Sequence, residues 1–485
     1  MTISKFSAKR DLLILLAILI VAFAFRLYKI NTPLADLHSW RQADTAAVAR
    51  NFNKLGFDLL HPRYDDLSSI ESGKENPNGW RMVEFPLYSA AFGLLYRYLP
   101  IFPVEIYGRL TTVFFSLVII AVIYYLTKKE AGRTAASFAA ITYAVMPFFV
   151  FFSRVVLPET TAVAFAFMAI LFLYQTTGAK SKSTPFGYYF LSILSFAVAV
   201  LIKPTVIFYG LPLLYLFAQK HQWSIWKKGD VYLYFILTLL PFVLWRLYIK
   251  QYPEGIPYND WLFTSVNTFE GLKKIFFKPA FFRWIFFERL GIGIFGVYLS
   301  VFFFLGLVAK TKKYLLHVIL LACVIYLFTF QGGNVQHEYY QTIILPPVAI
   351  MVGLGVAFLI SQGKYLLHPA LTYLLIAIFF TAGFAFSFYK VRDFYIYPND
   401  LIQKAKIISS LTNENDRIVT DRNGDTTLLY LANRRGSPAI YKTPAEFSAM
   451  GYKYLITANQ ESVANLKAEG YQVVVETNMF TLISL

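Results

Sequence analysis

Long apolar stretches separated by short polar links dominate the chain. A transmembrane helix needs about 20 mostly apolar residues, and about eleven stretches come near that length. They centre on residues 11–27, 108–127, 134–152, 157–175, 188–202, 204–219, 230–249, 291–309, 314–331, 339–360 and 369–388. The pair 188–202 and 204–219 is the least regular, because Lys203-Pro204 interrupts it. The pattern predicts a polytopic α-helical membrane protein with about eleven transmembrane helices.

The pattern changes after residue 390, where short apolar runs replace the long ones. Strands are predicted for IVTD at 418–421, YLIT at 454–457 and VVVE at 473–476, and helices for 401–411, 426–433 and 460–469. Strands that alternate with helices are typical of a layered α/β structure. We therefore expect a transmembrane domain over residues 1–390 and a small C-terminal α/β domain, outside the membrane, over residues 391–485.

Composition and charge agree with a membrane body. Only 15% of the residues are charged and 57% are hydrophobic, whereas soluble domains carry about 25% charged residues. The net charge of +17 would suggest nucleic acid on a soluble protein. Here Lys and Arg lie in the links between apolar segments, as the positive-inside rule describes, so no nucleic-acid partner is expected. The single Cys323 excludes a disulfide framework.

The basic links predict the orientation. They contain Lys128, Lys129 and Arg133; Lys180 and Lys182; Lys220, Lys227 and Lys228; Lys310, Lys312 and Lys313; and Lys364. All fall on one side when the N-terminus is cytoplasmic and the number of spans is odd. We expect a multi-pass inner (plasma) membrane protein, with the loop 28–86, the loop 250–290 and the C-terminal domain on the periplasmic or extracytoplasmic side.

The first outer loop holds the densest group of polar residues. Asp36, His38, Arg41 and Asp44 open it and Glu84 closes it. Residues three apart share a face of a helix, so His38, Arg41 and Asp44 can lie together on a short amphipathic helix. One carboxylate near a bilayer can deprotonate an acceptor and another can hold the acceptor or a metal. An ordinary solvated loop explains the same residues about equally well.

Four motifs in order resemble the GT-C superfamily of membrane glycosyltransferases. The resemblance is to the branch with protein O-mannosyltransferases and the transferases that add aminoarabinose to lipid A. The motifs are Glu84-Phe85-Pro86-Leu87-Tyr88 after the first loop, Ser153 to Glu159, Leu201-Ile202-Lys203-Pro204, and His337-Glu338-Tyr339-Tyr340 followed by Leu345-Pro346-Pro347. They span nearly the whole chain and fall on the predicted outer side.

The resemblance implies an inverting transfer of a sugar from a polyprenyl-phosphate carrier to an acceptor hydroxyl on a glycan, lipid or protein. It makes Asp44 the candidate base and Glu84 the second acid. The family's Asp-Glu pair is missing from this loop, so Asp36 stays an alternative base. Lys203, Arg154, His337, Tyr339 and Tyr340 would surround the carrier phosphate, Glu159 would orient the donor, and His38 and Arg41 would line the substrate site. No cofactor is certain, and a divalent metal stays open.

Each of these motifs also has a structural explanation. Lys203 can be a lysine that snorkels from a helix end, Arg154 and Glu159 can simply pair, and His337 can be a loop residue at the membrane surface. At the level of function, a transporter or flippase of a lipid-linked sugar would use the same intramembrane cations. Transporters usually carry internal repeats, which this sequence does not display, and the acidic first loop favours chemistry.

Overall fold

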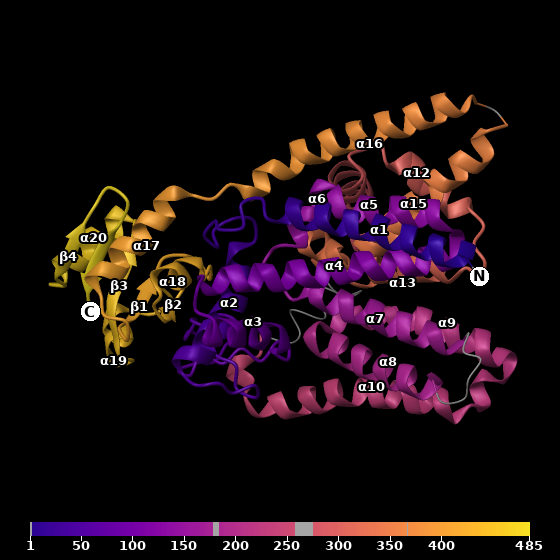
Figure 1. The fold of residues 1–485 in the computed structure, drawn as a ribbon. Coiled ribbons are helices and arrows are strands. Elements are labelled where there is room, and N and C mark those ends of the chain that lie inside the picture. Colours follow the sequence, from indigo (N-terminus) through magenta and orange to yellow (C-terminus); the bar gives the residue numbers. More distant parts are fainter. Residues whose placement is uncertain (1, 178–183, 258–274, 366) are drawn as a thin grey trace. The chain divides into compact units, whose positions relative to one another are not determined.

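The structure is a computed structural model that describes residues 2–177, 184–257, 275–365 and 367–485 (Figure 1). It divides into two compact units. The helical unit comprises Met1–Ile30, Leu110–Trp245 and Asp260–Asp393, and the mixed unit comprises Asn31–Arg109, Arg246–Asn259 and Phe394–Leu485. The predicted link at Lys180 and Lys182, and residues 258–274 of the predicted loop 250–290, lie outside the described residues. The division into domains at residue 390 stays a prediction.

The helical unit is built from the apolar stretches of the sequence. Its main helices are α1 (Thr2–Arg26), α5 (Arg133–Val145), α6 (Pro147–Phe152), α7 (Glu159–Thr177), α8 (Thr184–Ile202), α9 (Gly210–His221), α12 (Ser300–Val308), α13 (Leu315–Thr329), α15 (Leu345–Gly363) and α16 (Pro369–Val391). Most of α4 (Val104–Ala131) and α10 (Gly229–Tyr248) also belongs to it. The prediction of a mostly helical protein is confirmed.

Five helical stretches among the described residues are long and apolar enough to cross a membrane. They are Val104–Ala131, Glu159–Thr176, Gly229–Gln251, Glu338–Gly363 and Pro369–Leu411. Several of the other predicted segments contain shorter helices or breaks: Met146 separates α5 from α6, and a π-helix, η8 (Arg283–Ile294), precedes the short α12. The count of about eleven spans stays a prediction.

Helix α15 is the buried centre of the helical unit, packed between α5 and α12 (Figure 1). Its glycines allow this close approach. A Cβ atom on Gly353 would lie 2.3 Å from the carbonyl oxygen of Ala135 in α5, and one on Gly355 would lie 1.7 Å from that of Phe302 in α12. Small residues at a crossing let helix backbones touch, which is how apolar helices gain packing energy in a lipid environment.

A buried arginine closes the break between α5 and α6. Arg26, at the end of α1, donates from Nε to the Ser153 hydroxyl at 2.7 Å and from its terminal nitrogens to the carbonyls of Tyr143 and Ala144 at 3.0 and 2.9 Å. Helix ends leave carbonyls without partners, and a guanidinium satisfies several of them at once. Arg26 thereby fixes the backbone just before the motif that contains Arg154.

The mixed unit contains two helices from the predicted outer loop and the predicted C-terminal α/β structure. The loop helices are α2 (Ser39–Lys54) and α3 (Leu87–Tyr98). The sheet has the order β2-β1-β3-β5-β4, with β1 parallel to β2 and β3, and β5 antiparallel to β3 and β4. Its strands are β1 (Arg417–Thr420), β2 (Gly436–Ser437), β3 (Tyr452–Thr457), β4 (Val473–Glu476) and β5 (Thr481–Ser484).

Helices cover both faces of this sheet. One apolar core joins the sheet to α17 (Asn399–Leu411) and α18 (Thr427–Ala432), and a second joins it to α19 (Pro444–Ala449) and α20 (Gln460–Ala468). The small C-terminal sheet predicted from the sequence is confirmed, with strands where β1, β3 and β4 were expected. The sequence pattern did not predict β2, which is only two residues long, or β5.

The glycine crossing yields a test of the fold. Gly355→Val should lower the unfolding midpoint of the purified protein by several degrees, since overpacking against the Phe302 carbonyl costs about 3 kcal/mol. Gly187→Val is the matched control, because nothing lies within 4 Å of a Cβ at that glycine. Equal midpoints for the two variants, measured by thermal unfolding in detergent, would contradict the packing described for α15.

Candidate active site

Helix α2 is polar in sequence and largely buried in the mixed unit. Of its residues, Arg41, Gln42, Asp44, Thr45 and Asn51 are buried together with its alanines. Buried polar groups are costly unless they are paired, so the partners of α2 determine how the helix is held. His38 is the N-cap residue, with φ of 57° in the left-handed region, a conformation uncommon for residues other than glycine. The predicted short helix at His38, Arg41 and Asp44 is therefore present.

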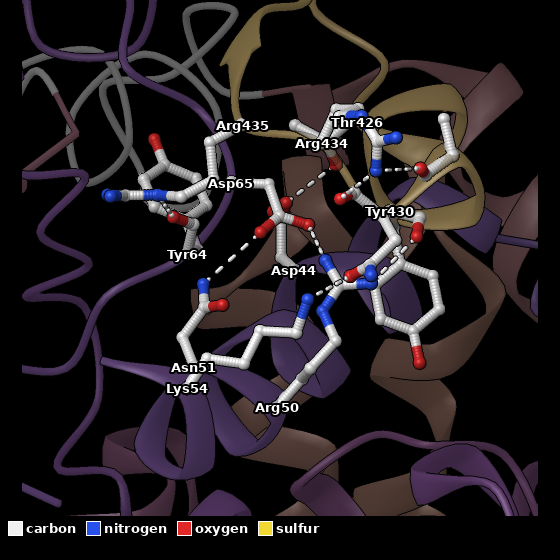
Figure 2. A network of polar contacts seen from close by, with 12 residues as sticks. Asp44, Arg50, Asn51, Lys54, Tyr64, Asp65, Thr426, Tyr430, Arg434 and Arg435 are labelled. Carbon is white, nitrogen blue, oxygen red and sulfur yellow. Dashed lines mark hydrogen bonds and ion pairs between the residues drawn. The ribbon is translucent and has the colours of Figure 1, made fainter. Parts of the chain in front are cut away.

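Asp44, the predicted base, is almost fully buried between two partners. Its Oδ2 lies 3.0 Å from an Arg81 guanidinium nitrogen, and its Oδ1 accepts a 2.6 Å hydrogen bond from the Thr426 hydroxyl (Figure 2). Burial raises the pKa of Asp44 to about 6, against the opposing effect of Arg81. An acid with this pKa is ionised at neutral pH and can still accept a proton.

Glu84, the predicted second acid, is held by Arg41. A terminal guanidinium nitrogen of Arg41 lies 2.5 and 2.6 Å from the two carboxylate oxygens. Both side chains are largely removed from solvent, with 6% and 15% exposed. Arg41 also lowers the pKa of Asp44 through its charge, so one cation influences both predicted acids.

Asp36, the alternative base, lies in a different environment. Its Oδ1 accepts a 2.7 Å hydrogen bond from the Gln42 side chain, and its Oδ2 lies 4.0 Å from Arg109. Asp36 is buried. The two candidate bases therefore have different partners. Asp44 pairs with Arg81, whereas Asp36 faces Gln42 and Arg109.

The second half of α2 is fixed by contacts with loops and with α18 of the mixed unit (Figure 2). Arg50 pairs with Asp65, donates to the Tyr430 carbonyl at 2.8 Å and lies 4.5 Å from the Tyr430 ring. Asn51 donates to Asp65 at 3.2 Å, and Lys54 pairs with Glu414. These contacts hold α2 against α18, which begins directly after Thr426.

A second buried acid lies near Asp44. Burial, together with the charges of Glu71 and Asp44, raises the pKa of Asp66 to about 7. Glu71 itself lies 2.9 Å from Arg81, so Arg81 pairs with two of the three carboxylates. Like charges within one site disfavour simultaneous ionisation. Asp44 and Asp66 therefore hold their protons at a higher pH than isolated carboxyls would.

The helical unit contains a separate pair of predicted residues. Lys203 Nζ lies 2.7 Å from Glu159 Oε1, with 11% and 2% of the two side chains exposed. Lys203 precedes the 3₁₀-helix η1 (Pro204–Tyr209), and Glu159 begins α7. Glu159 Oε2 and Thr205 Oγ1 are buried and have no hydrogen-bond partner among the described residues. A buried ion pair with unused polar atoms is suited to binding a polar ligand.

Aromatic residues extend this pair. The ring of Tyr340 lies 5.8 Å from Lys203 Nζ, and His337, Tyr339 and Tyr340 stack within 6.2 Å of one another. These residues begin the 3₁₀-helix η9 (Glu338–Ile344), where Glu338 pairs with Arg289. The motif that contains Tyr340 therefore lies beside Lys203 in the helical unit, and the roles predicted for these residues stay a prediction.

Arg154 is fully buried in the same unit. It donates to the Lys29 carbonyl at 2.7 Å and its guanidinium lies 5.6 Å from the Phe151 ring. Glu159 is paired with Lys203. The ion pair in this motif thus joins Glu159 to a lysine 44 residues away.

An apolar groove begins at η1, close to Lys203 in the chain. It has a volume of about 790 Å³ and lies between η1, α9, α10 and α13. Ile207, Phe208, Phe235, Leu239 and Ile325 are among the residues that line it. Long apolar grooves of this kind suit the hydrocarbon part of a ligand, since burial of apolar surface is favourable.

Three residues of the site were not predicted from the sequence. Arg109, near the start of a long apolar run, carried a usable signal, because ionisable residues at membrane depth are functional suspects. Arg81 had no signal beyond its place in a polar loop. Thr426 had none, since it lies 382 residues from Asp44. No group of three or more His, Cys, Asp or Glu side chains in the described ranges is placed to hold a metal ion.

Part of the chain matches a known protein family. Residues 101–247 match the family described as dolichyl-phosphate-mannose-protein mannosyltransferase. The matched range contains Arg154, Glu159 and Lys203 and excludes Asp44 and Glu84. Among curated proteins, no sequence matches the chain.

Solved structures share the fold at low sequence identity. ArnT from Cupriavidus metallidurans has a TM-score of 0.66 at 13% identity in the apo state, covering 99% of this chain and 98% of that one. Its complex with undecaprenyl phosphate also scores 0.66, at 14% identity, covering 98% and 97%. The oligosaccharyltransferase AglB from Archaeoglobus fulgidus, with an inhibitory peptide and a dolichol-phosphate, scores 0.59 at 11% identity, covering 93% and 69%. The resemblance to GT-C membrane glycosyltransferases is confirmed.

The raised pKa of Asp66 predicts that the protein loses folding stability as the pH rises. The folded chain keeps this proton up to about pH 7, whereas the unfolded chain loses it near pH 4. Stability is therefore lost as the pH rises from about 4 to about 7. Asp66→Asn should remove this loss, and raise the unfolding midpoint by several degrees at pH 8 and by less at pH 5.

The control for this prediction is Asp58→Asn. His61 and the Leu60 backbone N–H lower the pKa of Asp58, so its neutral replacement should give no stabilisation at pH 8. The measurement is thermal unfolding of the three proteins at both pH values. A larger gain for Asp66→Asn at pH 5 than at pH 8 would contradict the assignment.

Proposed function

We propose that this protein is an integral membrane glycosyltransferase. It moves a sugar from a polyprenyl-phosphate carrier to an acceptor hydroxyl at the outer face of the inner (plasma) membrane, with inversion at the anomeric carbon. The proposal assigns the carrier to residues of the helical unit and proton abstraction to residues of the mixed unit. It includes about eleven spans, a cytoplasmic N-terminus and an extracytoplasmic C-terminal region.

The observation that carries the proposal is the buried Lys203–Glu159 pair, whose lysine directly precedes η1, a helix that lines the apolar groove. A lipid phosphate needs a cation for its headgroup and an apolar path for its tail, and Lys203 and η1 supply both within a few residues. The ammonium would neutralise the phosphate as it leaves, where stabilisation of developing charge contributes most to catalysis. ArnT has been solved with undecaprenyl phosphate and AglB with a dolichol-phosphate, which supports this class of donor.

The neighbours of Lys203 have separate roles in the proposal. Arg154, His337, Tyr339 and Tyr340 contribute donors to the phosphate, and Glu159 holds Lys203 in place and accepts a hydroxyl of the donor sugar on its unpartnered oxygen. The acceptor, which can be a glycan, a lipid or a protein, loses its proton to Asp44. That proton then resides on Asp44 as the new glycosidic bond forms and the bond to phosphate breaks.

Glu84 and Arg41 support the acceptor side. The ion pair between them anchors the loop end before α3, and it keeps a positive charge near Asp44. His38 ends the loop that carries Asp36 into α2. Asp36 is the alternative base, and its separate partners make the two acids distinguishable by substitution.

A transferase differs from a transporter in what happens to the donor. Purified protein in detergent, supplied with extracted envelope lipids, glycans and proteins as acceptors, should transfer the sugar of a labelled polyprenyl-phosphate donor to an acceptor and release free polyprenyl phosphate. A transporter or flippase would leave the donor chemically unchanged. The assay is run with and without EDTA, because some members of the superfamily require a divalent metal.

The donor site is tested through its ion pair. Lys203→Gln should weaken binding of polyprenyl phosphate by about tenfold or more, because a charge-assisted contact is lost. Glu159→Gln keeps the ammonium and should retain most of that affinity. Lys203→Gln alone leaves the buried Glu159 carboxylate without its partner. The double variant Lys203→Gln, Glu159→Gln removes that unpaired charge, so it should fold and should still bind weakly.

Affinity for undecaprenyl phosphate is measured by the shift in unfolding midpoint on titration. Lys220→Gln, at an exposed lysine of the same unit, is the charge control. Equal affinity of the Lys203→Gln, Lys220→Gln and unmodified proteins would sink the donor assignment.

The base is tested by neutral replacement and pH. Asp44→Asn should lower the turnover rate by about 100-fold or more while donor binding stays unchanged. In the unmodified enzyme, activity should fall about tenfold per pH unit below pH 6, because protonated Asp44 cannot accept the acceptor proton. Asp36→Asn with turnover lost and Asp44→Asn with turnover kept would reverse the assignment.

The Thr426 hydroxyl provides a finer test of the same group. Its hydrogen bond lowers the pKa of Asp44, so Thr426→Val should raise that pKa further. The acid limb of the pH–rate profile should then move to higher pH by about one unit, with activity at high pH largely kept. A uniform loss at all pH values would indicate that Thr426 acts only in folding.

A further inference from the structure

A second cavity lies in the helical unit, beyond the crossing of α5, α12 and α15. Its volume is about 630 Å³. The cavity lies between the α4–α5 turn, the end of α12 and the last turns of α15. We call this space the basic cavity.

The basic cavity is lined by both charged and apolar side chains. Arg133 and Lys310 are its charged residues, and it has no acidic residue. Thr134, Ser361 and Gln362 add polar groups, whereas Val308, Leu354 and Phe358 are apolar. A free phosphate would use only the first half of this lining. An amphipathic molecule with an anionic head would use both.

Arg133 is held by an ion pair, and Lys310 lies in a link whose backbone is held by hydrogen bonds. Arg133 donates from Nε to Asp11 of α1, which also pairs with Lys128, so the guanidinium is anchored by one edge. Lys310 begins the link to α13, and that link is fastened to the α4–α5 turn. The backbone N–H groups of Lys312 and Lys313 donate to the Glu130 carbonyl and carboxylate at 3.1 and 2.8 Å.

Several basic links predicted to be cytoplasmic meet at this end of the helical unit. The links with Lys128 and Arg133, with Lys310 to Lys313, and with Lys364 all border the basic cavity or its helices. The cytoplasmic leaflet carries anionic lipids, and basic pockets between transmembrane helices on that side bind their headgroups. Val308 is 66% exposed and the neighbouring Phe304 is 63% exposed, so an apolar surface continues from the cavity along α12.

We propose that the basic cavity binds an anionic glycerophospholipid. The lipid phosphate lies against Arg133 and Lys310, and one acyl chain follows Val308 and Phe304 along α12. This site does not use the polyprenyl carrier or the residues assigned to glycosyl transfer, and it rests on the proposed function only for the cytoplasmic side of the basic links.

The test uses the purified full-length protein and two charge reversals. Phosphatidylglycerol is titrated into the unmodified protein, Lys310→Glu and Lys227→Glu, and bound lipid is counted by native mass spectrometry. Lys227 is exposed, lies on a predicted cytoplasmic link and does not line the cavity. We expect Lys310→Glu to weaken binding by about tenfold or more, and Lys227→Glu to leave it unchanged.

A third variant separates the two halves of the site. Ala357→Trp fills the space beside Phe358 and keeps both cations, so it should also lose bound phosphatidylglycerol. Its unfolding midpoint without lipid reports whether it is folded. A folded Ala357→Trp that binds as the unmodified protein does would overturn the acyl-chain part of the proposal.

The remaining outcomes distinguish the ligand. Phosphatidylcholine that binds as tightly as phosphatidylglycerol would overturn headgroup recognition. Inorganic phosphate that displaces phosphatidylglycerol at millimolar concentration would indicate a free-anion site. Equal losses in Lys310→Glu and Lys227→Glu would reduce the effect to general charge attraction and overturn the cavity as its origin.

Discussion

The mixed unit depends on one constraint, which is that a polar helix is buried and each of its polar side chains must be paired. Helix α2 would lie on the surface of an ordinary domain. Here Asp44 requires Arg81 and Thr426, Arg41 requires Glu84, and Arg50 requires Asp65. An unpaired buried charge costs several kcal/mol, so the loop between α2 and α3 is shaped by the need to deliver these partners. The raised pKa of Asp44 is a consequence of the same burial.

The helical unit meets a related constraint with fewer charges. Around α15 its helices pack closely at glycine residues, and Lys203 and Glu159 form a buried ion pair elsewhere in the unit. Such a pair contributes little to stability after its desolvation. Its placement beside Tyr340, with an unpartnered carboxylate oxygen, is better explained by ligand binding than by folding.

The sequence predicts structure well where a short-range pattern determines it. The apolar runs predict the helices of the helical unit, and strands β1, β3 and β4 follow from short apolar segments between turns. It predicts poorly where a contact joins distant segments. Thr426 has no property that marks it as a partner of Asp44, and the pairing of Glu159 with Lys203 could not be separated from a local pair with Arg154. The choice between Asp44 and Asp36 likewise depends on partners brought in by folding.

The Thr426–Asp44 hydrogen bond also has a consequence for biosynthesis. The two residues are separated by 382 positions, and ribosomes add about 5–20 residues per second. Helix α2 is therefore made roughly 20–80 s before one of its stabilising partners exists. During that interval Asp44 lacks the hydrogen bond from the Thr426 hydroxyl. Water or another polar group must then bond to the Asp44 carboxylate. The contact between α2 and Thr426 can therefore form only late in synthesis, although α2 is translated early.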